Sequence, residues 1–118
     1  MAVIAPTTQI NTDGIPHVHW TSIASGDTAT AFAIRARAGE YAAISIGGTF
    51  GAATVTVEVS QNNVNFYPLK DRDGTTISTT AAALFEFSTA AMYIRPVVTG
   101  AGATISCIMT LRGPASSV

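Results

Sequence analysis

The clearest hydrophobic pattern in the chain is a strict alternation over residues 54–60, where three valines alternate with polar side chains. A period of two places the valines on one face of a β-strand and the polar groups on the other. Asn62 and Asn63 interrupt this pattern, and asparagine tolerates the left-handed backbone of a tight turn. Residues 64–69 resume a strand that a proline weakens, and residues 71–74 predict a second turn.

Similar patterns recur along the rest of the chain. Alternation predicts strands at residues 15–23, 29–37, 41–46, 93–99 and 104–112, and a shorter one at 76–79. Alanines at the start of residues 81–87 could begin a helix, but the phenylalanines and flanking threonines favour a strand. Pro96 predicts a sheet edge or a bulge, because proline cannot donate a ladder hydrogen bond. About eight short strands with turns between them predict an all-β fold, an antiparallel β-sandwich or jelly roll.

The ends of the chain lack this periodicity. Residues 1–14 predict an extended N-terminal arm that ends in a turn, residues 15–113 a β-sandwich domain, and residues 114–118 a C-terminal tail. The arm could lie along its own domain or contact a neighbouring subunit. Under the second interpretation, the contact residues are Ile4, Pro6, Gln9, Ile10 and Ile15.

Composition favours association with other subunits. Of 118 residues, 47% are hydrophobic and only 11% are charged, against about 25% in a typical soluble domain. So few charges protect an isolated monomer poorly against association. The net charge of −1 gives no basic patch for nucleic acid or an anionic membrane. We find neither an apolar run of about 20 residues nor a secretory signal, and therefore expect synthesis and folding in the cytoplasm of the producing cell.

Two histidines form the first candidate site. His17 and His19 lie two positions apart on a predicted strand, so their side chains project to one face. With a third ligand such as Asp27 or Glu40, they could bind zinc or nickel. No second ligand pair is present in the sequence, so surface histidines are the favoured interpretation, and we expect no bound metal or cofactor.

Three further patterns each lack a part that their chemistry needs. Residues 47–51 are rich in glycine, but no lysine or helix follows to hold a phosphate, and a flexible connection is expected. Asp71 and Asp73 resemble the start of a calcium loop that no glutamate closes, which favours a turn. Glu58 and Glu86 could form an acid pair, although lone outward glutamates are usually only solvated. Because no nucleophile with a base can be named, we expect no enzymatic activity.

The cysteine and the aromatic residues have structural interpretations as well. Cys107 is the single cysteine and lies in a strand pattern, which predicts a buried, inert thiol. Aromatic side chains exposed on one face would suit stacking on a sugar, as in carbohydrate-binding β-sandwich modules. We expect Trp20, Phe66 and Tyr93 in the core instead.

Two segments resemble discoidin-type jelly rolls. These are residues 55–67 (VTVEVSQNNVNFY) and residues 93–100 (YIRPVVTG). In that family, a V-E-x-S-x-D/N-G-x-x-W/F hairpin precedes an R-Y-I/V-R strand. Here two asparagines replace the usual Asp-Gly, Phe66 supplies the aromatic, and Met92 stands where arginine is common. The resemblance concerns the fold more than the function.

A second resemblance covers about half the chain, from residue 47 to residue 113. The segments GGTFGAATVTVEVSQNNVNFYPLKDRDGTTI and MYIRPVVTGAGATISCIMTLRG resemble small β-sandwich virion proteins of tailed bacteriophages, some of which decorate the capsid as cement proteins. The resemblance implies a structural homo-oligomer, typically a trimer, on the capsid exterior. Its partners would be the major capsid protein and further copies of itself, with no nucleic acid and no membrane.

Capsid decoration is therefore the leading functional hypothesis. The subunits would bridge neighbouring capsid subunits and stabilise the phage head through many modest contacts, with the arm across a neighbour. The alternatives are a tail or baseplate component, an exterior adhesion module, or a carbohydrate-binding module.

Overall fold

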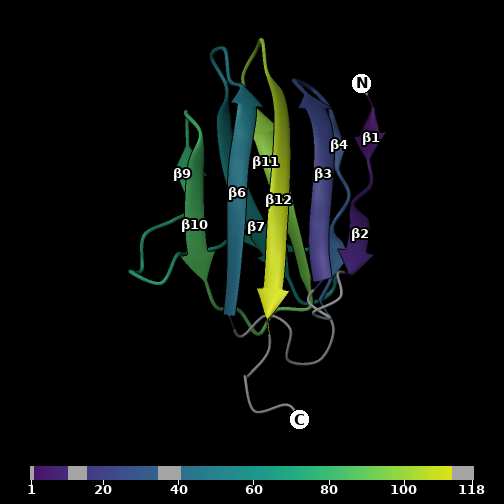
Figure 1. Ribbon diagram of the computed structural model, residues 1–118, viewed down its shortest axis with the longest axis vertical. Coiled ribbons are helices and arrows are strands. Elements are labelled where there is room, and N and C mark those ends of the chain that lie inside the picture. Colours follow the sequence, from purple (N-terminus) through teal and green to yellow (C-terminus); the bar gives the residue numbers. More distant parts are fainter. Residues whose placement is uncertain (1, 11–15, 35–40, 113–118) are drawn as a thin grey trace.

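The computed structural model describes residues 2–10, 16–34 and 41–112, and these form twelve β-strands and no helix (Figure 1). The strands are β1 (Val3–Ile4), β2 (Thr7–Ile10), β3 (Pro16–Ala24), β4 (Thr28–Ala29), β5 (Phe32–Ala33), β6 (Tyr41–Thr49), β7 (Thr54–Ser60), β8 (Phe66–Pro68), β9 (Ser78–Thr79), β10 (Ala83–Phe87), β11 (Tyr93–Thr99) and β12 (Thr104–Arg112). The described part of the chain therefore contains no helix that could cross a membrane.

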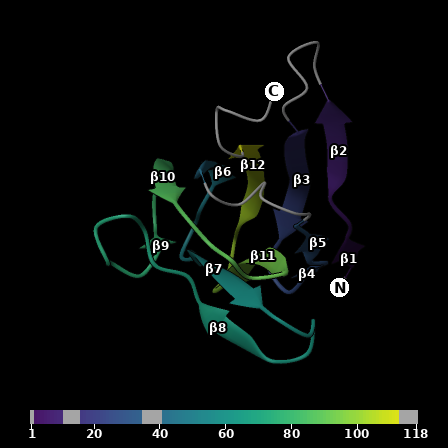
Figure 2. The ribbon, with the colours of Figure 1, turned by 90° about the horizontal axis from the view of Figure 1, so that it is seen from below.

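Two antiparallel sheets pack face to face, which confirms the predicted all-β sandwich. The first has the strand order β10-β6-β12-β3-β2, and the second has the order β5-β11-β7-β8 with β9 paired to β7. Figure 2 shows the two layers from one end, with β8 at the side farthest from the first sheet. A short parallel pair, β1 with β4, lies beside the sandwich.

The core lies between the sheets and follows from the alternation of apolar residues. On β7, Val55 and Val57 point inward and are fully buried, while Thr54 and Thr56 face outward and are half-buried. On β12, the inward residues are Ile105, Cys107, Met109 and Leu111, and Trp20 and Phe87 add the largest buried side chains. Burial of the alternating apolar side chains is the main force that holds the layers together.

Several predicted strands match the structure closely. Residues 54–60, 93–99 and 104–112 are β7, β11 and β12, and residues 15–23 differ from β3 by one position among those described. The phenylalanines of residues 81–87 do lie in a strand, β10, as the sequence favoured over a helix.

The strand predicted at residues 29–37 is wrong over its described part. Only β4 and β5 form there, and they pair with different partners, β1 and β11. Between them, Thr30 donates its N–H to the carbonyl oxygen of Ile4, and its own carbonyl accepts the indole N–H of Trp20 at 2.8 Å. These contacts hold the chain as it passes between sheets. Residues 35–37 and the turn predicted at residues 38–39 lie outside the described residues.

The glycine-rich connection predicted at residues 47–51 is also corrected. Gly47, Gly48 and Thr49 belong to β6 and pair with β12. Gly48 has a φ of +118°, and a Cβ there would collide with the carbonyl oxygen of Thr104. Glycine is needed at residue 48 because β12 approaches closely, and the connection itself begins only after Thr49.

Pro96 lies where β11 has a paired neighbour on one side only, among the described residues. It pairs with Val57 of β7, whereas β5 reaches only Tyr93 and Ile94 on the other side. The predicted sheet edge is therefore confirmed locally. The open side forms a shallow cavity of about 190 Å³ that Thr28 and Pro96 help to line.

Residues 2–10 of the predicted arm form part of their own domain. β2 pairs antiparallel with β3, and β1 pairs with β4. The Asp27 carboxylate accepts the N–H of Ala2 at 2.8 Å and that of Ala24 at 2.9 Å, so it joins the N-terminus to the β3–β4 turn. Contact of this segment with a neighbouring subunit stays a prediction.

Candidate interaction surface

The outer surface of the first sheet is a wide face that we call the broad face. It consists of the outward side chains of β10, β6, β12, β3 and β2, which stand at the front of Figure 1. Cross-strand register places one row of residues straight across it. In the strand order β10-β6-β12-β3-β2, the row is Leu84, Ser45, Ile108, His19 and Thr7.

The next row toward the lower end of the face has a similar character. Its described side chains are Glu86, Ala43, Thr110 and His17, one on each of β10, β6, β12 and β3. Glu86 is the charged member of these two rows, and it lies on the edge strand β10. The described centre of the broad face therefore carries no carboxylate, lysine or arginine.

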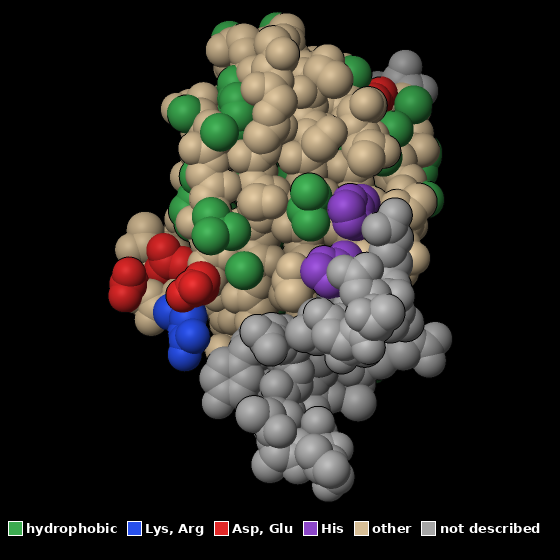
Figure 3. Space-filling model, in the orientation of Figure 1, with side chains coloured by type: hydrophobic (Ala, Val, Ile, Leu, Met, Phe, Trp, Pro, Cys, Tyr) green, Lys and Arg blue, Asp and Glu red, His purple; other side chains and the backbone are tan. Residues whose placement is uncertain are grey.

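Two aliphatic side chains stand out from this face. Leu84 is 65% exposed and Ile108 is 43% exposed, while Ser45 and Ala43 beside them are small and half-buried. Figure 3 shows hydrophobic side chains spread over this face, with the two histidines side by side and most of the visible charges gathered near one edge. Exposed aliphatic groups among small, uncharged neighbours make this face a candidate contact surface.

Ile108 is not among the contact residues predicted from the sequence, although its position in the strand pattern carried a signal. The alternation over residues 104–112 assigned Ile108 to the polar face together with Thr104, Ser106 and Thr110. A large aliphatic residue in a polar register is an exception to binary patterning. Such exceptions mark candidate contact residues.

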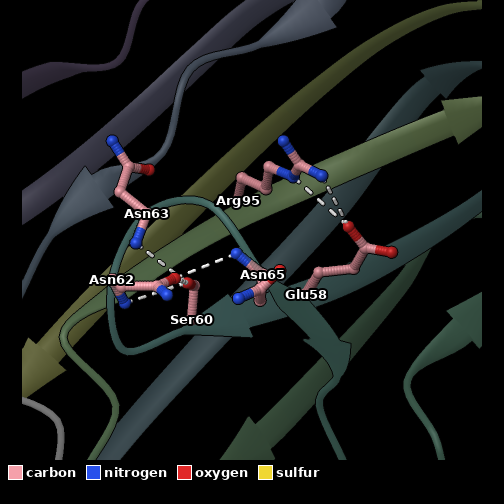
Figure 4. A network of polar contacts seen from close by, with 6 residues as sticks. All are labelled: Glu58, Ser60, Asn62, Asn63, Asn65 and Arg95. Atoms are coloured by element: carbon pink, nitrogen blue, oxygen red, sulfur yellow. Dashed lines mark hydrogen bonds and ion pairs between the residues drawn. The ribbon is translucent and has the colours of Figure 1, made fainter.

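The outer face of the second sheet differs because it contains a charge cluster (Figure 4). Arg95 donates from Nε and Nη2 to Glu58 Oε1 at 3.2 and 3.0 Å. Its Cζ also lies 3.7 Å from the ring centroid of Phe66. The arginine thus joins β11 to β7 and β8 through an ion pair and a cation–π contact.

The fold separates Glu58 from Glu86, the two carboxylates that the sequence analysis considered as an acid pair and judged more typical of solvated side chains. Glu58 lies on β7 of the second sheet and Glu86 on β10 of the first, so the two carboxylates are on opposite sides of the sandwich. Glu58 is paired with Arg95 instead.

The turn after β7 is held by side chains, as the asparagines predicted. Ser60 Oγ is buried and accepts the N–H groups of Asn62 and Asn63 at 3.2 and 2.9 Å. Asn62 Oδ1 accepts the N–H groups of Val64 and Asn65, and Asn63 has a φ of +61° (Figure 4). The loop takes up residues 61–65, which shortens the predicted strand at residues 64–69 to β8.

The two histidines lie on the broad face, and Asp27, one of the two residues considered as a third metal ligand, does not lie beside them. Asp27 follows the end of β3 far from His17 and His19, and its carboxylate binds backbone N–H groups. Those hydrogen bonds, from Ala2 first and Ala24 second, lower the pKa of Asp27 from its usual value. Within the described residues, no three His, Cys, Asp or Glu side chains could hold a metal ion, and Glu40 lies outside them.

Asp71 and Asp73 lie in a turn, as the sequence favoured over a calcium loop. Asp71 Oδ1 accepts the N–H groups of Asp73 and Thr75, both at 2.9 Å. Its backbone also accepts from Gly74. The carboxylate of Asp71 is thus used to close the turn.

Cys107 is fully buried between the sheets, as predicted. Burial raises the pKa of its thiol to about 12, because the thiolate would lose its solvation. The thiol is therefore protonated and inert at neutral pH.

The aromatic residues separate into buried and accessible groups. Trp20 is fully buried as predicted, whereas Phe66 and Tyr93 are only partly buried. Tyr67, on β8, is 63% exposed.

The predicted contact residues of the arm have different environments. Ile4 packs against the core of its own domain and Pro6 is half-buried, so Ile4 is not a free apolar anchor in this structure. Gln9 and Ile10 lie in β2, an edge strand of the first sheet. Ile15 and the side chains of Gln9 and Ile10 lie outside what the structure describes.

Comparison with known proteins identifies a similar fold. The chain is similar to the SPBc2 prophage-derived protein YomS, with a TM-score of 0.57 and 11% sequence identity. The likeness covers 90% of this chain and 93% of that one, so it extends over the whole sandwich. At this identity, it shows a shared fold alone. No protein-family model matches the sequence, and no curated protein sequence matches it significantly.

Proposed function

We propose that this chain is a structural protein of a tailed-bacteriophage particle, and that it decorates the capsid. It would stabilise the phage head by bridging neighbouring capsid subunits, with the major capsid protein as its partner. The observation that carries the proposal is the fold likeness to a prophage-derived protein over nine-tenths of both chains. The resemblance of residues 47–113 to small virion proteins supports the same class.

The surface supports a role that depends on binding. Its charged residues are few, at 11% of the chain, and the described centre of the broad face has none. A decoration protein is repeated many times over a shell, so modest contacts at each copy add up to a large stabilisation. A weakly polar sheet face can provide such contacts.

In this proposal, a strand of the N-terminal segment contacts the capsid, in place of the free arm expected from the sequence. Because Ile4 is committed to its own core, the capsid contact would come from β2, which lies at the edge of the first sheet. The opposite edge strand, β10, is partly covered, since Glu86 accepts the N–H of Arg72 at 3.0 Å. Unpaired backbone groups on an edge strand are a common site of strand addition by a partner.

The test is to add the purified chain to heads that lack it and to measure occupancy and thermal stability of the heads. The proposal expects saturable binding and heads that open at a higher temperature. A variant without residues 1–12 should lose this binding. Because the truncation also removes β1, β2 and the core contact of Ile4, its result counts only if the buried Trp20 keeps its native fluorescence. Unchanged occupancy by the truncated chain would contradict the role of β2, and absence of binding by the full chain would contradict capsid decoration.

A carbohydrate-binding role is the second candidate, because Tyr67 is 63% exposed on the edge strand β8. An exposed aromatic ring can stack on a sugar. A glycan array with the wild type and Tyr67→Ala would test it. Binding that the substitution abolishes supports this role, and no binding by the wild type excludes it for the glycans sampled.

A further inference from the structure

We propose that the broad face packs against the broad face of a second copy of this chain, in a two-fold dimer of sheet on sheet. This inference assigns the broad face to contacts between copies and leaves the edge of β2 for the capsid contact. The second copy would cover the exposed aliphatic side chains of Leu84 and Ile108, which are 65% and 43% exposed in the single chain.

A two-fold axis along the central strand β12 places Ile108 against its own copy and, on either side of the axis, brings bulky side chains opposite small ones. Such an axis places β12 over its own copy, β6 over β3 of the second copy, and β10 over β2 of the second copy. In the first row, Ile108 then meets Ile108 of the second copy at the centre. The imidazole of His19 would face the small side chain of Ser45.

The other pairs follow the same rule. Leu84 of one copy would face Thr7 of the other, and the imidazole of His17 would face Ala43. Protrusions would thus enter hollows on both sides of the axis, which is the condition for close packing of two sheets about 10 Å apart. Glu86 would lie at the rim, where its carboxylate stays hydrated.

The size of the face lies near the lower limit for a stable dimer. The strands β3, β6 and β12 have nine residues each, and the edge strands β10 and β2 have five and four. With about 3.3 Å per residue and about 4.8 Å between strands, the footprint is roughly 570 Å² per copy if every residue of these strands takes part. Stable interfaces begin at about 1,200 Å² in total, or about 600 Å² per partner.

This symmetry differs from the trimer expected from the sequence resemblance. A closed trimer needs two different patches on each subunit, whereas one face packed on itself gives an isologous dimer. The number of copies in the smallest closed assembly therefore discriminates between the two arrangements.

Sedimentation velocity between about 1 and 100 µM tests the proposal, with Ile108→Arg as the disrupting variant. The side chain of Ile108 points to solvent in the monomer, so the variant should fold, which circular dichroism verifies. We expect a wild-type dimer and an Ile108→Arg dimer at least about thirtyfold weaker, because two buried arginines would meet at the axis. Val64→Arg is the matched control, since Val64 is 75% exposed on the loop after β7, away from the broad face, and should leave the dimer unchanged.

A wild-type monomer throughout this range, a closed trimer, or a dimer that Ile108→Arg leaves intact would each overturn the proposal. Cross-linking with a bismaleimide that spans about 8 Å then tests the axis. Ile108→Cys should cross-link to itself. Leu84→Cys alone should not, because four strand spacings, about 19 Å, would separate the two copies of that cysteine. The buried thiol of Cys107 gives little background. Self-cross-linking of Leu84→Cys without Ile108→Cys would overturn the axis.

Discussion

Replacing Ser60 by alanine removes a hydroxyl that organises the turn between β7 and β8. This hydroxyl is buried, with only 2% of the residue exposed, and it accepts two backbone N–H groups, at 3.2 Å from Asn62 and 2.9 Å from Asn63. It also donates to Asn62 Oδ1 at 3.1 Å, and that oxygen accepts the N–H groups of Val64 and Asn65.

The expected cost follows from these contacts. Each hydrogen bond contributes about 0.5–1.5 kcal/mol net, and water can replace part of the loss because Asn62 and Asn63 are exposed. Ser60→Ala should therefore lower the free energy of unfolding by about 1–2 kcal/mol. For a chain of this length, that lowers Tm by roughly 3–10 °C.

Urea unfolding at fixed protein concentration, followed by fluorescence of the single tryptophan Trp20, measures this change. Ser78→Ala is the matched control, because Ser78 is an exposed serine on a short strand. Asn62→Ala should be costly as well, and its combination with Ser60→Ala should cost less than the sum, since the two side chains share one network. A Ser60→Ala midpoint equal to that of Ser78→Ala would refute the reasoning.

Three further predictions concern other parts of the sandwich. Cys107 should react with a thiol reagent only after unfolding, and rapid reaction in the native state would contradict its burial. Because the pKa of Asp27 is lowered on folding, its contribution to stability is present above the unfolded value of about 3.8 and is lost as pH falls through the lower native value. Asp27→Asn should therefore speed hydrogen exchange in β4 at neutral pH and weaken the acid dependence of stability, and unchanged exchange would contradict this. Gly100→Ala should destabilise the fold by about 1–3 kcal/mol in thermal unfolding, since Gly100 has a φ of +105° and the new Cβ would lie 2.6 Å from the carbonyl oxygen of Ala52. Gly47→Ala, with open space around it, should be nearly neutral, and equal effects of the two would contradict the account.

The sequence predicted the long strands well because each has one buried and one outward face. Residues 54–60 and 104–112 alternate for this reason, and the structure places them as β7 and β12. Prediction was poor at residues 29–37, where long-range contacts decide the path. The bond from Trp20 Nε1 to the Thr30 carbonyl oxygen joins residues ten positions apart and has no local sequence signature.

The candidate surface was only partly predictable. Low charge indicated weakly polar outer faces, but which side chains share a row depends on the order of the strands. Leu84 and Ile108 are distant in sequence, and both pair with Ser45 of β6. The arm shows the same limit, because the packing of Ile4 against its own core depends on the pairing of β1 with β4.

Direct imaging of the phage particle tests the central claim most directly. Cryo-electron microscopy of particles with and without this chain should show additional density on the outer surface of the head, of the size of this sandwich and at contacts between capsid subunits. Mass spectrometry of the same particles should detect the chain in many copies. Absence of the chain from purified particles, or density at the tail alone, would contradict capsid decoration.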